Sequence, residues 1–208
     1  MSRSHWRRAA RRLARLDDRP DVGFVSFFLA IETSSHARSS PLICFNHGKE
    51  SGPWGIKIKR LADVARAHGF AVVSPDYTHT FDPHERLEQL VESRPEGDPL
   101  VMVGSSMGGY VAAHACARLS VDALFLLAPA LYFPAWPEEP SAIPEHCAVL
   151  HGLHDDIVPP QVAERFCQRH GAVLHWLDAG HTLNERLDEV AAHFARFIAP
   201  LATPSEPA

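Results

Sequence analysis

The sequence predicts an α/β protein whose sheet is mostly parallel and flanked by helices. Short apolar runs alternate along the chain with longer segments whose apolar residues recur at helical spacing. The short runs are hydrophobic throughout rather than at every second residue, which is typical of parallel strands covered on both faces. Because ligands of such sheets collect at the carboxyl ends of the strands, we expect any chemistry in the residues that directly follow the apolar runs.

The alternation extends from residue 41 to residue 198. We expect strands at Pro41–Asn46, Phe70–Ser74, Leu100–Gly104, Val121–Leu127, Cys147–His151 and Val173–Leu177. We expect helices at Lys57–His68, Pro83–Glu92, Gly109–Leu119, Pro160–His170 and Leu183–Ile198. Gly69 follows the first of these helices as a C-cap residue would. The connection Ala128–Glu145 is rich in proline and aromatic residues and is too short to form a separate cap domain.

The two ends of the chain differ in composition from the rest. Residues 1–21 are rich in arginine and are predicted to form a flexible basic arm, residues 22–200 a single domain, and residues 201–208 a frayed tail. Val22–Ile31 reads as a further strand, since a membrane span takes about 20 apolar residues. We therefore predict no transmembrane segment. The net charge of −5 argues against a nucleic-acid partner.

Cysteine usage points to the cytoplasm. The four cysteines are far apart in the chain and form neither a C-x-x-C pair nor a zinc-binding spacing: Cys44, Cys116, Cys147 and Cys167. We expect them to be small buried hydrophobic residues in a reducing compartment. The pattern predicts no metal site, and no cofactor is required by the chemistry that the following motifs indicate.

A candidate nucleophile lies where the third strand meets its helix. Gly104-Ser105-Ser106-Met107-Gly108 fits the pattern G-x-S-x-G with Ser106 at its centre. In that pattern the central serine occupies a strained strand-to-helix turn that projects its hydroxyl above the sheet, and the glycines avoid clashes with the neighbouring strand and helix. The helix that follows directs its positive end at the serine. Ser105 is outside the centre of the pattern and is the weaker candidate.

A serine hydroxyl needs a base, and the chain order Ser, Asp or Glu, then His is expected on this scaffold. His181 follows the last predicted strand, in the turn "DAGHTL", and is the candidate base. For the acid, Asp155 and Asp156 both follow the strand that ends in "HGLHDDIVPP", and Asp178 is a weaker third candidate. The spacing alone leaves the choice between Asp155 and Asp156 open. His151 and His154 flank this loop and are expected to be structural.

An oxyanion hole requires two backbone N–H groups directed at one oxygen. Met107, directly after the candidate nucleophile, is expected to supply one. The loop after the first strand, "FNHGKESGPWG", is expected to supply the other from Lys49. This loop lacks the G-x-x-x-x-G-K-[ST] and G-x-G-x-x-G patterns, so we do not expect it to bind a phosphate.

Four of these segments together resemble a family. "NHGKESGP" is similar to the oxyanion loop of small α/β-hydrolase-fold serine hydrolases of the esterase or dienelactone-hydrolase-like kind, and "GSSMGG" to their nucleophile elbow. "HGLHDDIVP" is similar to their H-G-x-x-D-x-x-V-P acid loop, and "AGH" to their histidine loop. The resemblance covers about residues 41–198 and implies an α/β-hydrolase fold with a minimal or absent cap. It also implies Asp155, rather than Asp156, as the acid.

The resemblance implies cleavage of an ester or thioester of a small acyl substrate through Ser106, His181 and Asp155. Four aromatic residues near the predicted strand ends are candidates for the walls of an apolar pocket: Trp54, Tyr132, Phe133 and Trp136. Two alternatives remain open, a non-catalytic binding module on the same fold and a hydrolase recruited to a lipid or protein partner by the basic arm. The natural substrate and the oligomeric state do not follow from the sequence.

Overall fold

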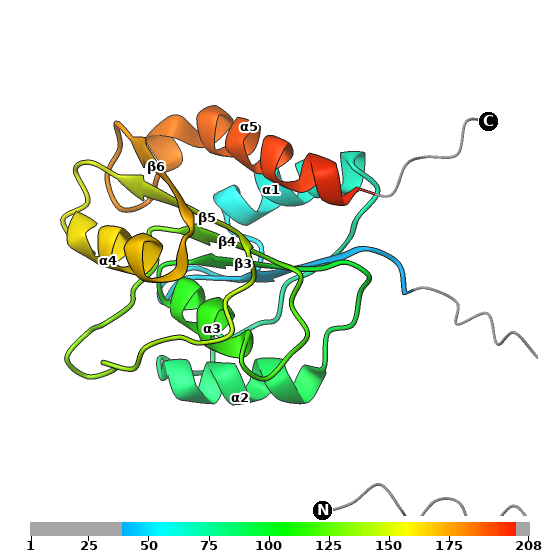
Figure 1. Cartoon of the computed structure of the whole chain (residues 1–208), viewed down its shortest axis with the longest axis horizontal. Coiled ribbons are helices and arrows are strands. Elements are labelled where there is room, and N and C mark those ends of the chain that lie inside the picture. Colours follow the sequence, from blue (N-terminus) through cyan, green and yellow to red (C-terminus); the bar gives the residue numbers. More distant parts are fainter. Residues whose placement is uncertain (1–38, 203–208) are drawn as a thin grey trace, which may run out of the picture. The chain divides into compact units, whose positions relative to one another are not determined.

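The computed structural model describes residues 39–202, which form a parallel sheet between two layers of helices (Figure 1). The six strands lie in the order β2-β1-β3-β4-β5-β6, and every neighbouring pair is parallel. Their bounds are β1 Leu42–Asn46, β2 Ala71–Val73, β3 Leu100–Ser105, β4 Ala123–Leu127, β5 His146–Gly152 and β6 Val173–Leu177. The predicted fold class is confirmed.

Helices cover both faces of this sheet, as the uniformly apolar strands required. α1 (Ile56–Ala67) and α5 (Leu187–Ile198) lie on one face, and α2 (Pro83–Ser93), α3 (Met107–Ala115) and α4 (Pro160–His170) on the other (Figure 1). In β1, Ile43 and Phe45 belong to the core beneath α1 and α5, whereas Leu42 and Cys44 belong to the core beneath α2, α3 and α4. Because successive strand residues point to opposite faces, each strand between two helical layers must be apolar at every position.

Two predicted helix starts differ from the structure by two residues or more, and the first helix begins one residue early, at Ile56. The third helix was expected from Gly109 but begins at Met107, directly after Ser106, because Gly108 and Gly109 lie inside its first turn despite their low helix propensity. The last helix was expected from Leu183, but that residue has a left-handed backbone with φ of 59°. A 3-10 turn (η1, Asn184–Arg186) therefore precedes α5, and a second one (η2, Ala199–Leu201) follows it.

Several predictions fall partly or wholly beyond the described part of the chain. The basic arm of residues 1–21 and the strand predicted at Val22–Ile31 lie outside the described residues, as does most of the tail, residues 203–208. The connection of residues 128–145 contains no helix and one isolated bridge, between Phe133 and Trp136, in line with the absence of a cap. All four cysteines are buried and free. None of the helices within residues 39–202 is long and apolar enough to cross a membrane.

The chain reverses direction across the sheet between β1 and β3. From β1 it moves outward to β2, then returns to β3 on the other side of β1 and continues outward to β6. The carboxyl ends of β1 and β3 are therefore adjacent, with Asn46 in register with Gly104. Such a switch point opens a crevice at the carboxyl edge of a parallel sheet, which is where ligands bind in this architecture.

The start of α3 packs against the backbone of β1 at this switch point. A Cβ atom on Gly108 would stand 2.0 Å from the carbonyl oxygen of Asn46, and one on Gly104 would stand 2.3 Å from the carbonyl oxygen of Gly108. Both contacts are with backbone atoms, which cannot rotate out of the way. The helix can therefore begin beside β1 only because these two positions carry no side chain.

Replacing Gly108 with alanine is expected to lower the free energy of unfolding by more than about 3 kcal/mol, since backbone must move to admit the methyl group. The matched control is Gly52→Ala, where a Cβ would meet nothing within 4 Å. That change is expected to alter the free energy of unfolding by less than about 1 kcal/mol. Urea unfolding followed by circular dichroism measures both. Equal stability of the two variants would contradict the close packing at Gly108.

Candidate active site

Ser106 occupies the turn between β3 and α3 in a conformation rare for its residue type. Its φ of 53° and ψ of −120° lie outside the common regions for a residue with a side chain. Backbone hydrogen bonds to the end of β4 and to the loop after it hold Ser106 there: its N–H donates to Leu127 O at 2.9 Å, and its carbonyl oxygen accepts from Ala130 N at 3.0 Å. Strain maintained by surrounding structure is common at functional sites.

His181 connects Ser106 to a carboxylate. It lies in the turn after β6, with Nε2 2.9 Å from Ser106 Oγ and Nδ1 2.8 Å from Asp155 Oδ2. Because an ionised carboxylate can only accept, Nδ1 carries the proton and Nε2 is left to accept the serine hydroxyl proton. The structure thus brings Ser106, His181 and Asp155 into one hydrogen-bonded chain.

Asp155 is the acid that the structure brings to His181. Its carboxylate is fully buried, and its other oxygen, Oδ1, accepts the backbone N–H groups of Ile157 at 2.9 Å and Val158 at 2.8 Å. These donors supply the partners that a buried charge requires. The two alternatives lie elsewhere, since Asp156 is exposed and Asp178 pairs with His154 and Arg186 at the surface.

His151 lies behind the acid rather than at the surface. Its Nε2 is 2.9 Å from Val158 O and 3.3 Å from Asp155 Oδ2, so the Nε2 proton faces both oxygens. Burial lowers the pKa of His151 and keeps the ring neutral. Within residues 39–202 its Nδ1 has no hydrogen-bond partner. The structural role expected for His151 therefore includes a contact with the candidate acid, Asp155.

Lys57 is a residue near the site that sequence reasoning missed. It lies in the first turn of α1, and its Nζ donates to the carbonyl oxygen of Thr182, next to His181, at 2.7 Å. Burial lowers the pKa of Lys57 to about 8, and the charges of Asp155 and Glu185 oppose that shift. The amine ties the histidine loop to α1. Only tertiary contact reveals this, because 125 residues separate the two partners.

The two candidate oxyanion donors belong to separate elements, α3 and the loop after β1. Met107 begins α3, so its N–H belongs to the first helical turn, where N–H groups lack helical partners. Lys49 lies in the turn after β1. The preceding residue, Gly48, approaches the serine so closely that a Cβ on it would be 3.5 Å from Ser106 Cβ. Within the described part of the chain, neither N–H has a backbone acceptor.

The four candidate pocket residues pack in two different ways. Trp54 is 40% exposed, and its ring lies beneath the guanidinium of Arg66 on α1. Tyr132, Phe133 and Trp136 lie in the connection after β4, where Trp136 packs near Tyr110 of α3. Within residues 39–202, none of the aromatic, cation–π or hydrogen-bond contacts of these four residues is with Ser106 or His181. Their role as pocket walls stays a prediction.

Two hollows on the surface of residues 39–202 lie away from this site. The larger, of about 540 Å³, is lined by residues around Arg94 and Leu100, at the amino end of β3. The second lies near His146 and Val173, at the amino ends of β5 and β6. Ser106, at the carboxyl end of β3, lines neither of them. Within residues 39–202, no group of three or more His, Cys, Asp or Glu side chains is arranged to hold a metal ion.

Solved structures of other proteins are similar to the fold of this chain. A proposed hydrolase of the alpha/beta superfamily from Xanthomonas campestris is 28% identical, with a TM-score of 0.69 over 77% of this chain and 99% of that one. A lidless α/β serine hydrolase from the same organism is 21% identical, with a TM-score of 0.58 over 83% and 87% of the two chains. An esterase from Pyrococcus furiosus is 16% identical, with a TM-score of 0.64 over 79% and 83%. The last two likenesses concern the fold alone.

A search of the curated proteins finds no match. The family model described as "Alpha/beta hydrolase family" matches residues 42–146, which contain β1 to β4, the loop after β1 and the turn that carries Ser106. The parallel sheet, its switch point and the strained serine between β3 and α3 all agree with that match. This chain belongs to the alpha/beta hydrolase family.

Proposed function

We propose that this protein is a serine hydrolase that cleaves the carboxylester or thioester bond of a small acyl substrate. The observation that carries the proposal is the hydrogen-bonded chain from Asp155 through His181 to Ser106 Oγ, with distances of 2.8 and 2.9 Å. A hydroxyl, an imidazole and a buried carboxylate in this order are the parts required for nucleophilic acyl transfer. The esterase from Pyrococcus furiosus, which shares the fold, agrees with this reaction class.

In the proposed reaction, Ser106 Oγ attacks the acyl carbon while His181 Nε2 accepts the hydroxyl proton. The N–H groups of Met107 and Lys49 stabilise the oxyanion of the tetrahedral intermediate. His181 then returns the proton to the departing alcohol or thiol, which leaves an acyl-enzyme. Water, activated by the same imidazole, attacks this ester, and the acid product departs as Ser106 regains its proton. Asp155 maintains the tautomer of His181 and stabilises the imidazolium.

Ser106→Ala tests the nucleophile. The variant is expected to lose labelling by a fluorophosphonate probe and to lose ester hydrolysis by a factor on the order of 10⁶ in kcat, because no other hydroxyl is hydrogen-bonded to His181 in the described residues. The control is Ser105→Ala, which keeps the hydrogen-bonded chain. Turnover that survives in Ser106→Ala, or a label that maps to Ser105 by mass spectrometry, would contradict the assignment of Ser106 as the nucleophile. A wild-type protein without label or turnover would instead favour a binding role for this fold.

Asp155→Asn tests the acid. The asparagine oxygen can still accept the N–H groups of Ile157 and Val158, so its amide NH₂ faces His181 and favours the wrong tautomer. We expect kcat to fall by a factor on the order of 10⁴ with the fold retained. Asp156→Asn is the matched control on the neighbouring exposed carboxylate, and its kcat is expected to stay within about threefold of wild type. A larger loss from Asp156→Asn would reverse the assignment.

The substrate range is expected to favour short acyl chains. The connection of residues 128–145 forms no helix that could cover the serine, so the site offers little apolar surface. Burying a methylene contributes about 0.8 kcal/mol, or about a fourfold gain per carbon, only where a pocket encloses it. Across p-nitrophenyl esters from acetate to decanoate, kcat/KM should therefore peak at a short chain. A steady rise to decanoate would show that an extended pocket exists.

A further inference from the structure

Arg86 of α2 is a fully buried arginine that has no acidic partner in residues 39–202. Its guanidinium donates only to backbone carbonyl oxygens. Two of these bonds go to Thr80 O, from Nε at 3.0 Å and from a terminal nitrogen at 2.8 Å. Burying a cation is costly and is usually offset by a carboxylate. The segments that carry these carbonyls therefore indicate what Arg86 does.

The remaining bonds of Arg86 go to three consecutive carbonyls of the loop after β1. The acceptors are His47 O at 3.3 Å, Gly48 O at 3.2 Å and Lys49 O at 3.4 Å. This is the loop that carries the candidate oxyanion donor. In a planar trans peptide, the C=O and N–H bonds point in opposite directions. The Lys49 N–H shares its peptide with Gly48 C=O, so it points away from the guanidinium.

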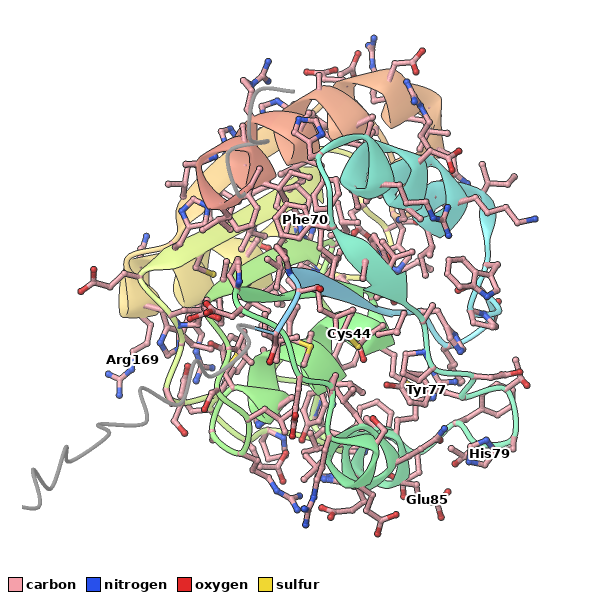
Figure 2. The ribbon with its side chains drawn as sticks, turned by 90° about the vertical axis from the view of Figure 1, so that its right-hand side faces the viewer. Cys44, Phe70, Tyr77, His79, Glu85 and Arg169 are labelled. Carbon is pink, nitrogen blue, oxygen red and sulfur yellow. The ribbon has the colours of Figure 1, made fainter. Side chains whose placement is uncertain are left out.

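A second donor holds the same peptide. His47 Nδ1 lies 2.8 Å from Gly48 O, and its Nε2 lies 3.0 Å from the backbone N of Tyr77. Because the Tyr77 N–H must donate, Nε2 accepts and Nδ1 carries the proton that is donated to Gly48 O. Burial lowers the pKa of His47, which favours this neutral form. Tyr77 lies in the segment between β2 and α2 (Figure 2). The cation of Arg86 lies 5.5 Å from the centre of the Tyr77 ring.

The loop needs such support because Gly48 has no side chain to restrict its rotation. The same glycine lies against Ser106, as its close approach to Ser106 Cβ indicates. A rotation of the Gly48–Lys49 peptide would replace an N–H donor with a carbonyl oxygen beside the serine. A carbonyl there would repel an oxyanion instead of stabilising it.

We propose that Arg86 is a positioning residue that directs the Lys49 N–H toward the oxyanion formed at Ser106. The inference rests on the proposed function and deepens it. Charge-assisted hydrogen bonds to the carbonyl ends also polarise these peptides and make their N–H groups stronger donors. Since the oxyanion exists only in the transition state and the tetrahedral intermediate, the contribution of Arg86 belongs in kcat and not in substrate affinity.

The kinetic test compares Arg86→Met, Arg86→Lys and Leu90→Ala on the same helix. Leu90 is fully buried in the core beneath α2 and has no hydrogen bond to the loop, so Leu90→Ala controls for lost stability. For Arg86→Met we expect kcat to fall by 10²- to 10³-fold, the loss typical of one oxyanion donor, with KM within about threefold. The affinity for a trifluoromethyl ketone, which mimics the oxyanion, should fall with kcat/KM. Arg86→Lys should recover at least about tenfold of the lost kcat.

The structural test needs no substrate. A crystal structure of Arg86→Met is expected to show the Gly48–Lys49 peptide rotated away from its wild-type orientation, whereas in Leu90→Ala it should be unchanged. If Arg86→Met does not fold, Arg86→Lys decides, because an ammonium offers three N–H donors where the guanidinium makes five hydrogen bonds. It should then lose kcat without a change in KM.

The outcomes separate the two proposals. The role of Arg86 would be overturned if the Gly48–Lys49 peptide were unchanged in Arg86→Met and kcat were like that of Leu90→Ala. If the methionine variant does not fold, the same two results in Arg86→Lys would overturn it. Inactivity of the wild-type protein toward fluorophosphonates and esters would overturn the proposed function instead. In that case the peptide orientation in the Arg86 variant still decides whether Arg86 holds the loop.

Discussion

The close approach of α3 to β1 is the constraint on which the site depends. Gly104 and Gly108 let the helix begin directly above the switch point between β1 and β3, where side chains would collide with backbone. This proximity forces Ser106 into its rare backbone conformation. It also brings the first turn of the helix beside the loop that carries Gly48. One packing contact thus brings together the candidate nucleophile, the N-terminus of α3 and the candidate oxyanion loop.

Two buried charges, Asp155 and Arg86, contact groups that adjoin Ser106, and in the proposed reaction they act on charges of opposite sign. Asp155 faces the imidazole, where positive charge develops, and it is held by the N–H groups of Ile157 and Val158. Arg86 faces the carbonyl side of the candidate oxyanion loop, whose N–H groups would meet negative charge in the proposed reaction. Arg86 is satisfied by backbone carbonyls alone, and Asp155 by two backbone N–H groups in addition to the imidazoles of His181 and His151. Backbone groups of this kind are oriented before the reaction, so little free energy is lost in reorganisation.

Some parts of the site could be recognised from the sequence and others could not. The glycines around Ser106 and the position of His181 after a strand are local signals, which carry their geometry with them. The spacing of residues left Asp155 and Asp156 equivalent, and only the similarity of the whole loop to a family separated them. Arg86 left a weaker signal: it lies beside Leu87 and four residues before Leu90, on the face of the predicted helix that should be apolar. A charged residue on a buried face indicates a specific partner, but not which one.

The sequence by itself determined the order of strands and helices, the parallel sheet covered on both faces and the edge at which chemistry should lie. These follow from hydrophobic periodicity and from glycine positions, which act over a few residues. Only the tertiary structure shows how Asp155 contacts His181, that Lys57 reaches the loop of Thr182, and that Arg86 reaches three carbonyls of the loop after β1. Those contacts join residues 26, 125 and up to 39 positions apart. Their geometry depends on the packing of whole elements, which no local pattern contains.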